Sequence, residues 1–193
     1  MMKDTFKTAA ILVATFTFLT GLVYPIAVTV IARVAFPSAS SGSLVVRDGK
    51  TIGSSLIGQS FTKAEYFHGR PSATSPVPCN ASSSSGSNLG QLNPALREAV
   101  AGRVDFLRQM DPNLTVVPVD LVTASASGLD PHISPASANA QVARVAKARG
   151  KSEDELRKLV ALHAEGRQFG LLGEPRVNVL LLNLALDEAK LQP

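Results

Sequence analysis

The stretch VDLVTASASGLDPHISP, residues 119–135, leads into the sequence QVARVAKAR at residues 141–149, and the two together decide the fold. The apolar, β-branched residues around its start predict a strand over residues 115–123. A loop of small residues follows and ends in two prolines. The spacing of apolar residues after the second proline predicts one amphipathic helix that reaches Arg149. Loops held between ordered elements are where binding and catalytic residues tend to lie.

This loop carries the residue types of a hydrolase triad within eight positions, namely Ser125, Ser127, Asp130 and His132. Triads, however, are assembled from residues far apart in sequence, and the nucleophile usually lies in a G-x-S-x-G turn, which this sequence lacks. The alternative is that these residues shape a turn ahead of the helix that Ser134 caps. We therefore predict no catalytic residue, and a membrane-anchored hydrolase or solute-binding domain stays the alternative hypothesis.

Three helices are marked by their first residues. Asn93 followed by Pro94 opens a helix with an apolar stripe at Leu96, Val100, Val104 and Leu107. Ser134 and Pro135 open the next helix in the same way, with Ala138, Val142, Val145 and Ala146 as its apolar line and Gly150 as its end.

A capping box formed by Ser152 and Glu155 predicts the start of a third helix. Its apolar face includes His163, which we expect to be at least half-buried with its hydrogen bonds satisfied. A last apolar run over residues 176–184 predicts a strand, followed by a short helix from Ala185.

The pair Asp48-Gly49 between two β-rich runs, residues 43–46 and 51–57, predicts a hairpin with a type I′ turn. Residues 72–92 are rich in Ser, Pro, Gly and Asn and predict a long loop. Helices and strands are mixed without regular alternation, so we predict an α+β domain.

The N-terminal region predicts a membrane anchor. Residues 8–32 hold no charged side chain, and as a helix they would be about 37 Å long, enough to cross a hydrocarbon core of about 30 Å. The alternative is a cleaved signal peptide, but its apolar region usually spans only about 7–15 residues. We therefore expect an N-terminus at 1–7, a transmembrane helix at 8–32, a linker at 33–42 and one domain at 43–193.

Flanking charges predict the orientation of this anchor. Lys3 and Lys7 precede the apolar run, whereas only Arg33 follows it closely. The positive-inside rule then places the N-terminus in the cytoplasm and the C-terminal domain outside it. The protein would be a single-pass protein of the plasma membrane.

Other classes of function find little support in the composition. The net charge of +4 comes from scattered residues, and no Trp accompanies the basic side chains, so we expect no nucleic-acid partner. The single cysteine, Cys79, excludes an intramolecular disulfide. His68, His132 and His163 are too far apart in sequence to form a motif of metal ligands, so we expect no metal site.

Two segments have some features of nucleotide-binding loops. Residues 53–60 have the glycine spacing of a P-loop but lack its lysine, and we expect them to lie in a strand. Residues 82–87 are serine-rich and allow either a phosphate nest or a flexible loop, of which we favour the loop.

Seven motifs in order resemble the KdpC family, whose members belong to the bacterial Kdp high-affinity potassium-transporting P-type ATPase. They are IGQSF at 57–61, YFHGRPSA at 66–73, SSGSNLG at 84–90, DLVTASASGLDPHIS at 120–134, QVARVA at 141–146, GEPRVNV at 173–179 and LNLALD at 182–187. The resemblance covers nearly the whole chain.

The resemblance implies a potassium-transport complex in the bacterial inner membrane. Its other members would be a channel-like potassium-translocating subunit, a P-type ATPase subunit and a small single-helix subunit. This chain would be a non-catalytic accessory subunit, needed for assembly, that acts as a catalytic chaperone by raising the ATP affinity of the ATPase subunit. Gln141 would contribute to nucleotide contact, with ATP shared between the two subunits.

Two alternatives to that nucleotide role follow from the residues. Gln141 precedes Val142 on an amphipathic helix, where a solvated or interface glutamine is the simpler interpretation. A domain outside the cytoplasm would also not meet cytoplasmic ATP. The domain would then cap the outer entrance of the channel-like subunit, with the polar loop at 82–93 facing that entrance.

Overall fold

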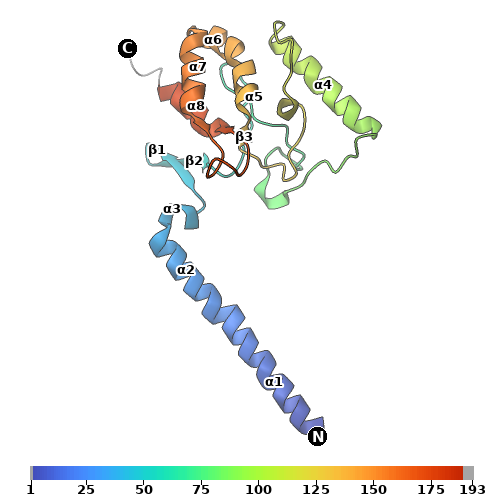
Figure 1. The fold of residues 1–193 in the computed structure, drawn as a ribbon, viewed down its shortest axis with the longest axis vertical. Helices are drawn as coiled ribbons and strands as arrows, with labels where there is room; N and C mark the ends of the chain where they lie inside the picture. The colour runs from blue at the N-terminus through green and yellow to red at the C-terminus, as the bar shows by residue number, and fades with distance from the viewer. Residues whose placement is uncertain (1, 189–193) are drawn as a thin grey trace. The chain divides into compact units, whose positions relative to one another are not determined.

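The computed structural model describes residues 2–188 (Figure 1). The chain forms two compact units, one ending at Ile52 and the other beginning at Gly53.

The first unit begins with a long apolar helix. It consists of α1 (Met2–Phe18), a π-helical segment (Leu19–Val23) and α2 (Tyr24–Ala35). By length and composition this helix is long and apolar enough to cross a membrane. No residue in its most apolar stretch is buried. It contains the predicted segment 8–32 and extends past it at both ends.

The π-helical turn lies next to a proline. Pro25 has no N–H to donate to the carbonyl of Gly21, and its ring would collide with that carbonyl in a regular α-helix. A widened turn over Leu19–Val23 accommodates the ring without ending the helix. The apolar run therefore continues as one helix despite its glycine and proline.

A short helix, α3 (Pro37–Ser40), occupies the predicted linker, and a two-stranded sheet of β1 (Leu44–Arg47) and β2 (Lys50–Ser54) follows. Asp48 and Gly49 have φ angles of 52° and 74°, which confirms the predicted turn with two left-handed residues. The expectation of a strand over 53–60 is wrong beyond Ser54. The hydroxyl of Ser54 accepts from the backbone N–H of Leu56, and its carbonyl accepts from that of Ile57, so the chain turns there.

The second unit mixes helices with a small antiparallel sheet. The helices are α4 (Pro94–Met110), α5 (Pro135–Ala140), α6 (Val142–Arg149), α7 (Glu153–Leu162) and α8 (Val179–Glu188). The sheet has the order β3 (His132–Ile133), β5 (Arg176–Asn178), β4 (Ala164–Glu165). The predicted mixture of helix and sheet is confirmed.

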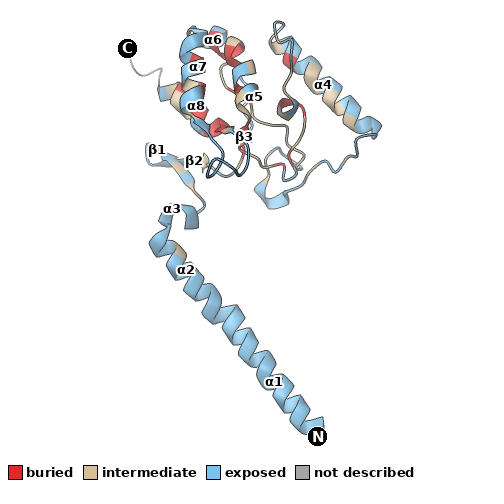
Figure 2. Cartoon of the chain, viewed as in Figure 1, coloured by how far each residue is buried: buried red, intermediate tan, exposed pale blue. Residues whose placement is uncertain are grey.

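The hydrophobic core gathers around α5, α6, α7 and α8, where buried residues cluster in Figure 2. The apolar line predicted for the second helix is confirmed, because Ala138, Val142, Val145 and Ala146 are all at most 3% exposed. Phe67, Leu182 and Leu186 are fully buried beside them. Each such side chain contributes about 1.5–3 kcal/mol by leaving water.

The predicted helix ends are confirmed. The side chain of Asn93 accepts from the N–H of Ala95, and that of Ser134 accepts from Ser137. Ser152 and Glu155 form both hydrogen bonds of the capping box. Gly150 ends α6 with a left-handed φ of 63°.

Three predicted elements differ in the structure. Residues 115–123 form no strand, because Pro118 leads into a 3₁₀ turn at Val119–Leu121. The helix predicted after Ser134 is two helices, α5 and α6, with Gln141 between them.

The strand predicted over 176–184 ends at Asn178. The side-chain oxygen of Asn178 accepts from the N–H of Leu181 at 3.2 Å, and this bond favours a helix start over further strand. The run that follows, VLLLNLALDE, forms α8.

Candidate functional site

The centre of the second unit is a segment, residues 64–68, that turns at Ala64 and Glu65 and then continues outside any sheet. Phe67 within it is fully buried, and His68 is 8% exposed. Buried backbone groups need hydrogen-bond partners, and here side chains supply them.

Two side-chain amides supply these hydrogen bonds for Phe67 and His68. Asn183 of α8 accepts from the N–H of Phe67 and donates to its carbonyl, both at 2.9 Å. Gln141 accepts from the N–H of His68 at 2.8 Å and donates to its carbonyl at 3.1 Å. Each amide therefore pairs with one residue as a neighbouring strand would.

Gln141 is 3% exposed, so the expectation of a solvated or interface glutamine is wrong. Its nitrogen also donates to the carbonyl of Ser137 at 3.2 Å, and its oxygen also accepts from Arg144 at 2.7 Å. The amide thus has both donors and both acceptor positions occupied. The break between α5 and α6 lies at this residue.

Arg144 is a buried cation that makes no ion pair with a carboxylate within residues 2–188. Its guanidinium donates to the carbonyls of Ala64 and Tyr66 and to Gln141. Burial lowers the pKa of Arg144 to about 10, so it stays charged at neutral pH. Neutral oxygens therefore supply the hydrogen bonds that this charge needs in place of water.

Arg149 holds the same segment at its other end. It donates to the carbonyl of Glu65 at 2.7 Å and pairs with Asp187 at 2.9 Å. Its guanidinium also lies 4.8 Å from the ring centre of Tyr66, whose hydroxyl donates to Asp187. Residues 64–68 are thus held by α6 and α8 together, and we call this arrangement the amide clamp.

His68 is held neutral by its surroundings. Burial is the main cause that lowers its pKa below the ordinary value, and the charge of Arg144 lowers it further. Its Nε2 lies 3.0 Å from the carbonyl of Lys63, an interaction that raises the pKa and only partly opposes the other two.

The loop with the triad-like residues is packed against residues 72–86. Ser85 donates its backbone N–H to the carbonyl of Ser127, and the hydroxyl of Ser72 donates to the carbonyl of Gly128. A side chain on Gly128 would meet the carbonyl of Ser85 at 2.6 Å, and one on Gly86 would meet Ala126 at 2.8 Å. The close approach requires glycine at both positions.

The two serines serve this loop. The hydroxyl of Ser125 accepts from the N–H of Gly128 at 2.9 Å, and that of Ser127 accepts from Leu129 at 3.1 Å. In the described part of the chain no hydrogen bond joins either serine to His132. The arrangement is that of a turn rather than of a nucleophile and its base.

Asp130 and His132 also act locally. Asp130 accepts from the backbone N–H of His132 at 3.0 Å and pairs with Arg70 at 3.1 Å. Burial alone would raise the pKa of Asp130, but hydrogen bonds from His132 and Arg70 outweigh it and hold the pKa below its ordinary value. The prediction that these residues shape a turn is confirmed.

Asp120 joins the 3₁₀ turn to the start of α5. Its carboxylate accepts from the backbone N–H of Ser134 at 2.7 Å and from the hydroxyl of Ser137. Burial would raise the pKa of Asp120, but these hydrogen bonds lower it below its ordinary value. The residues on both sides of the loop are therefore tied to one another.

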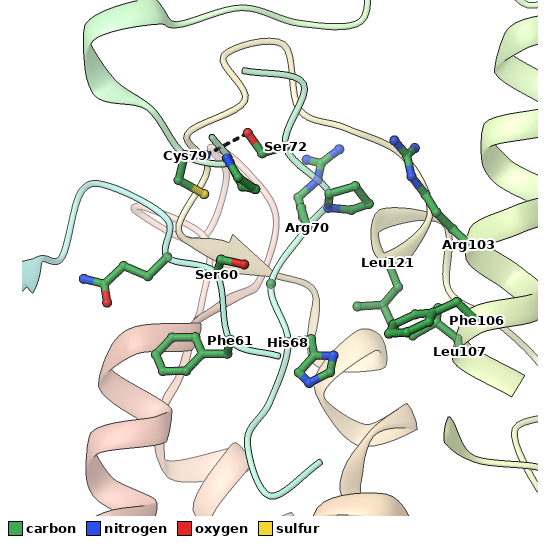
Figure 3. A pocket seen from close by; sticks show the side chains of 14 residues that line it. Ser60, Phe61, His68, Arg70, Ser72, Cys79, Arg103, Phe106, Leu107 and Leu121 are labelled. Carbon is green, nitrogen blue, oxygen red and sulfur yellow. Dashed lines mark hydrogen bonds between the residues drawn. The ribbon is translucent and has the colours of Figure 1, made fainter. Parts of the chain in front are cut away.

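One cavity of about 240 Å³ opens beside the amide clamp, between residues 59–79 and α4 (Figure 3). Figure 3 shows Arg70 and Arg103 on one side of it and His68 on the other. Arg103 donates to the carbonyl of Val122 at 2.7 Å, and Arg70 is paired with Asp130. The volume lies below the roughly 300–1,000 Å³ of small-molecule pockets.

Among residues 2–188, no three His, Cys, Asp or Glu side chains lie close enough to hold a metal ion. His163 ends α7, is half-buried and contacts the carbonyl of Leu159 with its Nδ1 at 3.0 Å, as predicted. The serine-rich residues 82–87 form an exposed loop whose Ser84 donates to the carbonyl of Ser127.

Comparison with known proteins identifies the family. The family model described as "KdpC: K+-transporting ATPase, c chain" matches residues 6–188. The chain belongs to this family. A KdpC subunit of a potassium-transporting ATPase from Polaromonas naphthalenivorans is 60% identical over 190 residues, which cover 98% of this chain and 97% of the relative. A protein with the same description from Sorangium cellulosum is 62% identical over 185 residues, or 95% and 97% of the two chains.

Membership of the KdpC family makes this chain a subunit of a multi-subunit potassium-transporting ATPase, as the resemblance implied. The amide clamp was not predicted from the sequence. Its signals were present, since Asn183 interrupts the apolar run of α8 and Gln141 adjoins the apolar line of α6. A polar amide at a buried helical position indicates a backbone partner elsewhere.

Replacing Gln141 by Ala is expected to lower the free energy of unfolding by about 1–3 kcal/mol, because the backbone groups of His68 lose their partners while staying buried. The matched control is Asn139→Ala, which removes an exposed amide two residues away. It is expected to lower the free energy of unfolding by only a few tenths of the change caused by Gln141→Ala. Urea unfolding of the full chain in detergent measures both. Equal effects of the two variants would contradict the amide clamp.

Stability is expected to fall as the pH drops from 7.5 to 5.5. The unfolded chain protonates a histidine near pH 6.5, whereas folded His68 resists protonation, so the unfolded state binds more protons below that pH. Replacement by Gln, which can still donate to Lys63, is expected to flatten this dependence. Thermal midpoints at the two pH values test it, and an unchanged slope in His68→Gln would argue against a buried neutral histidine.

Proposed function

We propose that this chain is a non-catalytic accessory subunit of an ATP-driven potassium uptake complex, needed for its assembly and for a high ATP affinity of the ATPase subunit. Its partners are a channel-like subunit, a P-type ATPase subunit and a small single-helix subunit. The support is the family match over residues 6–188 and relatives described as KdpC subunits that align over nearly their whole length.

The effect on ATP is indirect in this proposal. The observation that carries it is the enclosure of Gln141, whose amide makes four hydrogen bonds within the domain. A nucleotide could bind this amide only after the amide clamp had opened. Contact between ATP and Gln141, and sharing of ATP between the two subunits, are what the family resemblance implied and are the alternative to this proposal.

The orientation is part of the same proposal. The N-terminus lies in the cytoplasm and the second unit lies outside the inner membrane. The support is the apolar helix from Met2 to Ala35, with two lysines near its start and Arg33 near its end. An ATP-binding face on the cytoplasmic side would then belong to another subunit.

Topology is tested with cysteines placed in a Cys79→Ser background. Cys79 itself is half-buried, and burial raises the pKa of its thiol, so it reacts slowly. A membrane-impermeant maleimide on intact spheroplasts is expected to label Lys158→Cys, which is exposed on α7, and not Thr5→Cys. If only Thr5→Cys were labelled, the N-terminus would lie outside and the second unit in the cytoplasm.

The effect on ATP is tested by comparing the complete complex with the ATPase subunit prepared without this chain. Omitting this chain is expected to raise the KM for ATP several-fold, because the ATPase subunit loses the contacts that stabilise its ATP-binding state. Photolabelling with an azido-ATP is expected to mark the ATPase subunit and to leave this chain unlabelled, with excess ATP as the competition control. A label near Gln141 would instead support direct contact, and an unchanged KM would refute the role in ATP affinity.

A further inference from the structure

The segment between β4 and β5 projects from the second unit as a hairpin with an apolar tip. Every residue from 164 to 175 is exposed, and this part of the chain is coloured as exposed in Figure 2. Phe169 is 92% exposed, Leu171 79% and Leu172 61%. Exposed apolar side chains are common singly, but three grouped within four positions indicate a contact surface.

The hairpin is ordered rather than loose. Gln168 and Leu172 exchange two backbone hydrogen bonds of 2.9 Å across the tip. At its base, Nη2 of Arg167 lies 2.7 Å from both carboxylate oxygens of Glu174. One step further, Arg176 pairs with Glu165 on the opposite strand. The tip is therefore presented in a fixed shape, which lowers the entropy lost on binding.

The tip carries backbone strain at its most exposed side chain. Phe169 has a φ of 54°, in the left-handed region that glycine tolerates and a bulky aromatic residue does not. Gly170 next to it has a φ of 72° and accounts for half of the turn. A strained phenylalanine that contacts water gains nothing within this chain, and such outliers point to a role in binding.

We propose that residues 168–172 dock into an apolar pocket on an extramembrane face of another subunit of the same potassium-transporting ATPase. This inference rests on the membership of a multi-subunit complex in the proposed function. It adds the surface by which this chain holds its partner.

The charges around the tip favour a protein pocket over a lipid surface. A bilayer with anionic lipids attracts unpaired Lys and Arg, and Trp and Tyr settle at its interface. Here both arginines at the base, Arg167 and Arg176, are paired with glutamates, and the tip holds Phe and Leu. An apolar centre within a rim of satisfied polar groups is the usual anatomy of a protein–protein interface.

The test uses the complete complex with an affinity tag on this chain. Phe169→Asn combined with Leu171→Asn removes the apolar tip, and asparagine tolerates the left-handed φ, so the fold is retained. The share of partner subunits that remains bound after a detergent wash is expected to fall about tenfold. The control is Val116→Asn, because Val116 is 77% exposed and lies in another loop. Equal retention by the two variants overturns the proposal.

A photo-crosslinking phenylalanine analogue at position 169 identifies the occupant. A crosslink to another subunit supports the proposal, whereas an adduct with lipid, or no crosslink in the assembled complex, overturns it. The outcome is separable from the proposed effect on ATP. A crosslink to a partner together with an unchanged KM for ATP would retain the docking surface and reject only the role in ATP affinity.

Discussion

The second unit depends on two side-chain amides that hydrogen-bond to the backbone of a buried segment. Gln141 and Asn183 supply the backbone hydrogen bonds that Phe67 and His68 would otherwise lack in the interior. Phe67 is thereby fixed in the core between α6 and α8, where it is fully buried. Without these amides, four buried backbone groups would be unsatisfied, and that cost is comparable to a large part of the stability of a small domain.

Other polar side chains in the interior are also hydrogen-bonded within the domain. Asp120 binds Ser134, the N-cap of α5, and Asp130 binds Arg70 and the backbone of His132. Arg144 is solvated by carbonyl oxygens. Because these groups are engaged in holding loops together, they are not positioned to act on a substrate. These polar side chains therefore have a structural role in the second unit.

The elements that could be predicted from sequence are those with local causes. The helix starts at Asn93, Ser134 and Ser152 follow from side chains that cap their own backbone, and the turn at Asp48 and Gly49 follows from the φ angles it requires. Residues 176–184 were mispredicted because an apolar run suits a strand or a buried helix equally. Only the side chain of Asn178, which bonds to Leu181 and to the carbonyl of Ser55, decides between them.

The amide clamp was harder to predict from the sequence, because its hydrogen bonds join residues that are far apart in the chain. Gln141 and His68 are 73 positions apart, and Asn183 and Phe67 are 116 apart, so their pairing is a result of the tertiary fold. A helical pattern places Gln141 next to a buried line without saying what its amide meets. The resemblance to a known family located the residue, but only the structure shows that the amide is enclosed.

The hairpin and the amide clamp are joined through one strand, β5. β5 forms one side of the hairpin, pairs with β3 through His132 and Asn178, and passes directly into α8, which carries Asn183. Each step of this path is either a hydrogen-bonded strand pair or the continuous chain from β5 into α8. A partner seated on the tip would therefore set the position of the whole second unit. In the proposed function, the protein would then influence ATP use elsewhere in the complex by where it holds its partners.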